Sequence, residues 1–204
     1  MTPRLADTRD LSALVDVLSQ AFADDPVLTW SFGPNVSVAT IFREMIAGCY
    51  LRLGFAHMVD GAAASLWLPS GRTPHLPAHR ELRIGLTALR SGGLSALRRA
   101  LKVAGIVERS HPKTPHYYLF AIGVSPDRQG QGLGRRLLLE GLAMADQDRA
   151  PVYLENSRPR NARFYESCGF RAREPIALPE GAPPLIPMWR EGRRGLTGVR
   201  NGTP

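Results

Sequence analysis

The 204-residue chain has few cysteines, almost no lysine and no long uncharged apolar run. Its two cysteines, Cys49 and Cys168, are far apart in sequence, which predicts neither a disulfide framework nor a thiolate metal site. We therefore expect a reducing, cytoplasmic setting. No stretch of about 18 uncharged apolar residues occurs, and the opening residues MTPRLADTRD have no apolar segment behind their charges. We expect neither a membrane span nor a secretory signal.

The rest of the composition is typical of a folded protein. With 44% hydrophobic and 22% charged residues, and with 20 glycines and 17 prolines scattered along it, the chain is neither fibrous nor wholly disordered. Its length suits one domain with a sizeable core. We expect that domain at 1–189, followed by a flexible basic tail at 190–204.

The formal charge of +8 is unevenly distributed. Residues 72–113 carry nine basic and two acidic side chains, a net charge of +7, whereas residues 1–71 carry a net charge of −3. Such a basic segment suits phosphate contacts, and a non-catalytic module that binds nucleic acid or regulates a partner is one hypothesis. However, the segment lacks interleaved aromatic residues and any groove-reading motif, so nucleic acid is not the favoured partner.

Hydrophobic spacing predicts alternating helices and strands. Helices are expected at 10–23, 36–52, 131–146 and 161–168, together with a pair at 81–107 broken at Ser91-Gly92-Gly93. Strands are expected at 55–59 and 63–68, joined by an Asp60-Gly61 turn, and at 116–124, 151–155, 170–177 and 185–190. The basic helical pair interrupts the strand series as an insertion at about 72–113. This order predicts a mixed α/β or α+β single domain.

The most informative stretch lies between the strand at 116–124 and the helix at 131–146. Glycines at 130, 132 and 134 leave backbone N–H groups uncovered at a helix N-terminus, where the peptide dipoles favour an anion. A dinucleotide fingerprint begun at Gly130 needs a third glycine where Arg135 stands, and the Gly-Lys-Ser/Thr triplet of a Walker loop is absent. The pattern predicts a phosphate cradle of another kind.

Two blocks carry a resemblance to a known family. The motif Gln129-x-x-Gly132-x-Gly134, after a strand ending IGV at 122–124, resembles the coenzyme A pyrophosphate loop of the GNAT superfamily of N-acetyltransferases. Downstream, LEN at 154–156 and NARFYESCGF at 161–170 are similar to the strand, the Asn-bearing helix and the FYxxxGF close of that superfamily. The wider pattern resembles the puromycin acetyltransferase-like branch, whose members acetylate amines of small molecules.

The resemblance implies a central, mixed, mostly antiparallel sheet flanked by helices, whose splayed central strands hold acetyl-CoA. It implies acetyl-CoA as co-substrate, no metal, and direct attack by a neutral amine in a ternary complex, through a tetrahedral oxyanion. We expect a small-molecule amine as acceptor, because the inserted helices are expected to wall off a small pocket. A protein lysine or N-terminus is the alternative acceptor, and the assembly is expected to be a monomer or homodimer.

The resemblance also assigns cofactor-binding residues. It gives the pyrophosphate to backbone N–H groups of Gln129, Gly130, Gln131, Gly132, Leu133, Gly134 and Arg135. It gives the pantetheine arm to main-chain groups of Ile122 and Val124, with Asn156 or Asn161 nearby. The N–H of about Ile122 is the candidate donor to the oxyanion.

Three residues are candidates for proton transfer. Tyr165 matches the superfamily position for the acid that protonates the leaving thiolate. Glu155 is the preferred base or amine anchor, because a carboxylate is costly to bury at the end of an apolar strand. His116, at the start of the central strand, is the second candidate base. Asp24 and Asp25 are candidates for binding a cationic substrate or for capping a helix.

The other histidines carry weaker signals. His75 and His79 have a metal-like interval, but Pro77 between them disfavours the helix that would bring them together, so no metal is expected. His111, just before Pro112, is interpreted as structural or exposed.

Overall fold

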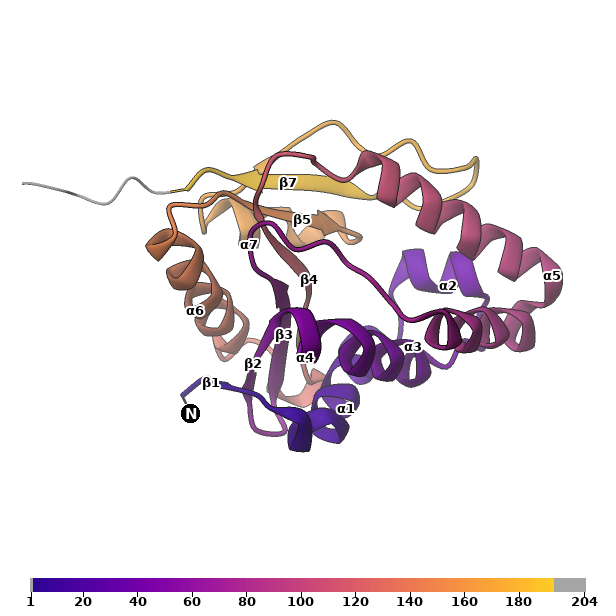
Figure 1. Cartoon of the computed structure of the whole chain (residues 1–204), viewed down its shortest axis with the longest axis horizontal. Coiled ribbons are helices and arrows are strands. Elements are labelled where there is room, and N and C mark those ends of the chain that lie inside the picture. Colours follow the sequence, from indigo (N-terminus) through magenta and orange to yellow (C-terminus); the bar gives the residue numbers. More distant parts are fainter. Residues whose placement is uncertain (1, 193–204) are drawn as a thin grey trace, which may run out of the picture.

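A seven-stranded sheet in the order β1-β2-β3-β4-β5-β7-β6 organises the protein, as the computed structural model shows for residues 2–192 (Figure 1). The strands are β1 (Arg4–Leu5), β2 (Phe55–Val59), β3 (Ala63–Leu68), β4 (Tyr117–Val124), β5 (Val152–Asn156), β6 (Arg171–Ala172) and β7 (Ile186–Arg190). Neighbouring strands are antiparallel except β4 and β5, which are parallel. The predicted mixed, mostly antiparallel sheet is confirmed.

Helices cover both faces of this sheet (Figure 1). They are α1 (Leu11–Ala21), α2 (Pro26–Phe32), α3 (Val38–Met45), α4 (Leu51–Leu53), α5 (Ala78–Ser110), α6 (Leu133–Gln147) and α7 (Ala162–Glu166), with short turns η1 (Thr8–Asp10), η2 (Ile46–Tyr50), η3 (Pro126–Arg128) and η4 (Pro159–Asn161). On one face α1, α3 and η2 bury their apolar stripes, including Leu14 and Phe42. On the other face α6 packs Leu138 and Leu142 around Trp67. Within residues 2–192, no helix is long and apolar enough to cross a membrane.

The central strands diverge at the middle of the sheet. Within the described chain, β4 pairs with β5 at Tyr117–Val152 and Tyr118–Tyr153 and not beyond. A bulge in the β3–β4 ladder leaves Phe120 as an extra residue of β4, and bulges bend a strand. The two strands therefore separate after two residue pairs, as the resemblance implied, and leave a cleft between them.

Helix α2 was not predicted from the sequence. The Asp25-Pro26 pair follows the helix predicted at 10–23, and it begins a further helix, α2. The Asp25 carboxylate accepts hydrogen bonds from the N–H groups of Val27 and Leu28 at 3.1 and 3.0 Å, and Pro26 occupies the first helical turn. An Asp cap followed by Pro is a helix start signal as well as a stop, because proline has no N–H to satisfy at that position.

The basic insertion forms the predicted pair of helices. They are the two arms of α5, which part at Gly92 and Gly93, and Figure 1 shows them on either side of α2. Arg80 donates to the buried Glu44 of α3 at 2.7 Å, and Arg99 donates to a backbone carbonyl of α2 at 2.7 Å. Part of the positive charge of this segment is therefore used to hold α5 against α2 and α3.

The closing segment differs from its prediction. The strand expected at 170–177 is only two residues long, and the next contact is a single bridge between Ile176 and Leu185. Prolines at 175, 179, 183 and 184 explain the interruption, because they offer no N–H to a ladder. Strand β7 continues through the buried Arg190, one residue beyond the predicted domain boundary. The predicted tail from 193 onward lies outside the described residues.

Candidate active site

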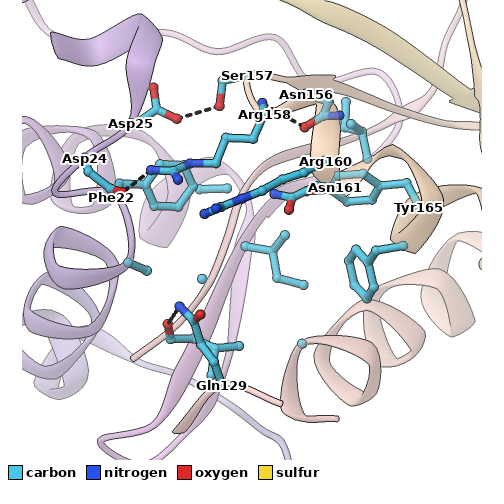
Figure 2. A pocket seen from close by; sticks show the side chains of 18 of the residues that line it. Phe22, Asp24, Asp25, Gln129, Asn156, Ser157, Arg158, Arg160, Asn161 and Tyr165 are labelled. Carbon is cyan, nitrogen blue, oxygen red and sulfur yellow. Dashed lines mark hydrogen bonds and ion pairs between the residues drawn. The ribbon is translucent and has the colours of Figure 1, made fainter. Parts of the chain in front are cut away.

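A cavity of about 780 Å³ occupies the space where β4 and β5 diverge (Figure 2). Its lining comes from residues 119–124 of β4, 154–158 at the end of β5, 20–25 after α1, the loop before α6, and η4 with α7. Among the described residues, α5 contributes nothing to this lining. The expectation that the insertion walls the pocket is therefore wrong, because the two arms of α5 pack on α2 and α3 instead.

The loop between β4 and α6 has the conformation that its glycines predict. Gly130 and Gly132 have φ of +76° and +73°, a region that other residues rarely adopt. Gly132 precedes α6 without any side-chain cap, so the first N–H groups of that helix remain free to bind an anion. Gln129 donates to the carbonyl of Val124 at 3.3 Å, which ties the loop to the end of β4.

The main-chain groups of β4 alternate between its two edges. The N–H of Ser125 donates to the carbonyl of Ala62 beside β3 at 2.8 Å. Because successive residues of a strand direct their amides to opposite edges, the N–H and C=O groups of Ile122 and Val124 face away from β3 and into the cleft. The carbonyl of Val124 accepts from Gln129, whereas the N–H of Val124 and the backbone groups of Ile122 face the cleft where the resemblance implied a pantetheine arm and an oxyanion.

The predicted cofactor residues do not all reach the cleft. Those that line it are Ile122, Val124, Gln129, Gly130, Gly134, Asn156 and Asn161. Gln131, Gly132, Leu133 and Arg135 belong to the same turn but are not part of the lining. The guanidinium of Arg135 instead donates to Ser167 Oγ at 3.2 Å.

Asn156 ends β5 as a buried polar residue. Its Oδ1 accepts the N–H of Arg158 at 3.1 Å, which forms a tight turn after the strand. Its Nδ2 has no hydrogen-bond partner within the described chain. A buried amide without a partner is costly, so this Nδ2 is a candidate donor to a ligand that reaches it.

Tyr165 lies on α7 at the edge of the cleft (Figure 2). Its ring packs against Phe164 and Phe170. Burial raises the pKa of Tyr165 well above the ordinary phenol value. The phenol therefore stays protonated at neutral pH and is able to donate a proton or a hydrogen bond.

Glu155 brings a carboxylate into the cleft from β5. Its side chain is only 7% exposed. Oε2 accepts a hydrogen bond from the hydroxyl of Tyr118 at 2.7 Å, whereas Oε1 has no hydrogen-bond partner within residues 2–192 and lies 3.6 Å from His111 Nδ1. Burial, and then the charge of Glu155, raise the pKa of Tyr118. Tyr118 is therefore a fixed donor to Oε2, and Oε1 is a buried carboxylate oxygen without a hydrogen-bond donor among the described residues.

Residues 96–172 match a family model described as an acetyltransferase (GNAT) domain. The chain carries a GNAT acetyltransferase domain. Such domains generally use acetyl-CoA, and the matched region contains the glycine loop before α6, the diverging strands and Tyr165.

Whole-chain comparisons agree with the domain match. The chain is 26% identical to an uncharacterized N-acetyltransferase (C550.08) of Schizosaccharomyces pombe, in an alignment that covers 87% of this chain and 77% of that protein. A crystal structure from Corynebacterium glutamicum, described as histone acetyltransferase HPA2 and related acetyltransferase, is 25% identical. It covers 96% of this chain and 98% of that one, with a TM-score of 0.70. The protein has the GNAT fold and is an N-acetyltransferase.

More distant structures share only the fold. The polyamine N-acetyltransferase of Drosophila melanogaster is 17% identical, with a TM-score of 0.58, over 93% of this chain and 99% of that one.

His116 does not reach the GNAT cleft. The ring is 7% exposed and absent from the lining, and its Nδ1 lies 2.7 Å from the carbonyl of Thr114. Burial lowers the pKa of His116, so its ring is neutral at neutral pH. This position does not favour His116 as the group that takes a proton directly from a substrate.

Two contacts across the cleft were not predicted. Ser157 donates to the Asp25 carboxylate, and Arg158 binds Asp24, so the turn after β5 is joined to the turn after α1 (Figure 2). Asp25 is buried and is also the cap of α2, which is the capping role considered for it. The cap was readable from Asp25-Pro26, whereas no local pattern marks Ser157 or Arg158 as its neighbours.

Proposed function

We propose that the protein transfers the acetyl group of acetyl-CoA to the amine of a small molecule, with both substrates bound in the cleft at once. The observation that carries the proposal is the buried Glu155 carboxylate, whose Oε1 has no hydrogen-bond partner and whose side chain lines the cleft. A positively charged ammonium group is the natural partner for such an atom.

The donor end of the cleft fits acetyl-CoA, which supplies the acetyl group as a reactive thioester. The N–H groups at the start of α6, freed by Gly130 and Gly132, would hold the pyrophosphate. The inward-facing backbone of Ile122 and Val124 would hold the pantetheine arm, with Asn156 Nδ2 as a further donor.

Three groups of the chain suit the charges and proton transfers of the reaction. The N–H of Ile122 would donate to the carbonyl oxygen as it becomes negative. Tyr165, kept protonated by burial, would give its proton to the departing thiolate. Glu155 would hold the ammonium of the acceptor and take a proton from it, so that the amine becomes a nucleophile.

A small acceptor is favoured by the two links across the cleft, Asp25–Ser157 and Asp24–Arg158. They join the turn after β5 to the turn after α1, and such links would restrict the entry of a peptide at that point. A protein lysine is the second candidate acceptor. Its support is the description of the Corynebacterium glutamicum relative as a histone acetyltransferase, and it would require Arg158 to release Asp24.

The puromycin acetyltransferase-like branch and a cytoplasmic location stay part of this proposal. Both cysteines, Cys49 and Cys168, are buried free thiols, which suits a reducing compartment.

The test is a coenzyme A thiol-release assay with acetyl-CoA and a panel of acceptors. The panel contains aminonucleosides, aminoglycosides, polyamines, arylamines and a lysine peptide. We expect amine-dependent release with at least one small amine and little with the peptide. Release with the peptide alone would replace the small-molecule proposal by the protein one, and no release with any acceptor would refute both.

A further inference from the structure

His111 contacts Glu155 on the side of the carboxylate opposite Tyr118. It is the residue that ends α5, and its Nδ1 lies 3.6 Å from Glu155 Oε1. Among the salt bridges of residues 2–192, His111 is the partner of Glu155. The basic insertion thus contributes to the site indirectly, because its last turn delivers an imidazole to the carboxylate that lines the cleft.

The hydrogen bonds of His116 fix which nitrogen of His111 carries a proton. A backbone carbonyl only accepts, so His116 Nδ1, 2.7 Å from the carbonyl of Thr114, must donate. Since His116 is kept neutral by burial, its Nε2 is an acceptor. That atom lies 3.1 Å from His111 Nε2, which must therefore be the donor.

These hydrogen bonds place the proton of a neutral His111 ring on Nε2 and leave Nδ1 without one. When the ring is neutral, Nδ1 carries a lone pair and lies 3.6 Å from Glu155 Oε1, a little beyond hydrogen-bond distance. A small shift of either side chain would let the two groups share one proton, either on the carboxyl or on the imidazole. A second proton on His111 does not disturb its bond to His116, because Nε2–H remains the donor.

The surroundings hold this geometry in place. The rings of Tyr118 and Tyr153 stand edge-on to His111 with centroids 4.8 and 5.1 Å away, and the His116 ring is 4.9 Å away. The titratable groups around the pair are Tyr118 of β4, His116 just before that strand, Tyr153 of β5, Tyr50 of η2, and Arg173, whose charge reaches His116. Burial raises the pKa of all three tyrosines, so they keep their protons, and His111 is the neighbour of Glu155 with a ring nitrogen able to receive one.

We propose that His111 is the proton outlet of Glu155 and that His116 fixes its tautomer. The inference rests on the proposed function. An N–H bond of the bound ammonium breaks, its proton goes to Glu155 Oε1, and the electron pair stays on nitrogen to form the new bond to the acetyl carbon. The proton then passes from Oε1 to His111 Nδ1 and on to water, since the His111 side chain is 17% exposed.

His111 is thus a positioning residue that acts through Glu155, and the relay connects the two candidate bases of the sequence. Glu155 touches the cleft, His116 does not, and the residue between them carries the proton. After each turnover Glu155 returns to its carboxylate form without releasing the proton into the substrate cavity.

The kinetic test compares His111→Asn, His111→Gln and His116→Gln with His79→Gln, which makes the same change at an exposed histidine of the first turn of α5. Asparagine imitates Nδ1 and glutamine imitates Nε2, but neither amide carries a proton onward. We expect kcat to fall about 10-fold in both His111 variants and less in His116→Gln, with the KM for acetyl-CoA unchanged in all of them.

The pH profile separates a relay from mere packing. In the wild type we expect kcat to rise with pH as His111 becomes neutral, because the ring must be neutral to receive a proton. In the His111 variants this limb should move to lower pH and lead to a lower plateau, since only a carboxyl then needs to be ionised. If the His111 variants lose the same fraction of kcat at every pH, and kcat rises over the same pH range as in the wild type, the relay is overturned and His111 is a packing residue.

A readout without substrate completes the test. Nitrogen-15 NMR of the imidazoles should show His116 protonated on Nδ1 and His111 on Nε2 in the wild type above neutral pH. The opposite tautomer at His116 would overturn the inference even if the variants were slow. Wild-type protein that acetylates no amine would overturn the proposed function and the relay together, whereas normal turnover with the profile unchanged in His111→Asn would overturn the relay alone.

Discussion

The two ends of the cleft are built from different parts of the chain. The donor end consists mainly of backbone from one continuous region, in which β4, its glycine loop and the start of α6 follow each other directly. The proposed acceptor end depends on side chains brought together from distant segments. Glu155 of β5 lines the cleft, and Tyr118 of β4 and His111, just after α5, contact its carboxylate from outside the lining. A backbone site requires only glycines and a strand-to-helix turn, whereas a side-chain site requires the whole tertiary structure.

This division predicts that variants will separate into two groups. Changes at the acceptor end should reduce kcat and leave acetyl-CoA binding intact. Changes in the glycine loop should weaken acetyl-CoA binding and leave kcat intact. The variants below are ordered from the largest expected effect to the smallest.

Glu155→Gln should have the largest effect, because it removes both the anchor and the base for the acceptor while keeping the shape of the side chain. We expect kcat/KM for the amine to fall about 100-fold or more. The dissociation constant of acetyl-CoA, measured by calorimetry, should not change. A kcat/KM equal to that of the wild type would remove Glu155 from the chemistry and end the comparison drawn above.

Tyr165→Phe should lower kcat by about 10-fold or more, since it removes the proposed acid for the thiolate. Because burial raises the pKa of Tyr165, its ionisation should cause no fall in wild-type kcat up to about pH 10. The measurement is kcat against pH for both proteins. Unchanged turnover of the variant across neutral pH would exclude Tyr165 as the acid.

Gly132→Ala tests the donor end. A Cβ at Gly132 meets no atom within 4 Å, so the substitution acts through the left-handed conformation alone, at a cost of about 1 kcal/mol. We expect acetyl-CoA binding to weaken about 5-fold as the loop relaxes, with the KM for the amine unchanged. Gly71→Ala is the matched control, because Gly71 has φ of +79°, also has open space around it, and lies outside the cleft. Equal loss of binding in both variants would contradict a local role.

Arg158→Ala should have the smallest effect. It removes the link to the largely exposed Asp24, so the free energy of unfolding should change by less than about 0.5 kcal/mol. We expect the KM for the small amine to rise only a few-fold and activity on the lysine peptide to increase, because one link across the cleft is lost. A lower peptide activity would show that Arg158 binds the acceptor instead of restricting it.

The accuracy of the sequence predictions also differs between the two ends of the cleft. The elements that form the donor end were predicted to within two residues, because a strand, a glycine loop and an amphipathic helix are all local patterns. Helix α2 was missed, since Asp25-Pro26 is both a stop and a start signal. His111 was interpreted as structural or exposed, because its contact with Glu155, 44 positions away in the chain, has no local signature. The role of the inserted helices was also mistaken, because the packing of α5 on α2 depends on single contacts such as Arg99 with Trp30.

The most direct test of the division is a calorimetric titration of acetyl-CoA into the wild type, Glu155→Gln and Gly132→Ala. We predict saturable binding at one site, with equal affinity in the wild type and Glu155→Gln and weaker affinity in Gly132→Ala. Absence of binding to the wild type, or a loss confined to Glu155→Gln, would contradict a backbone-built donor site in this cleft.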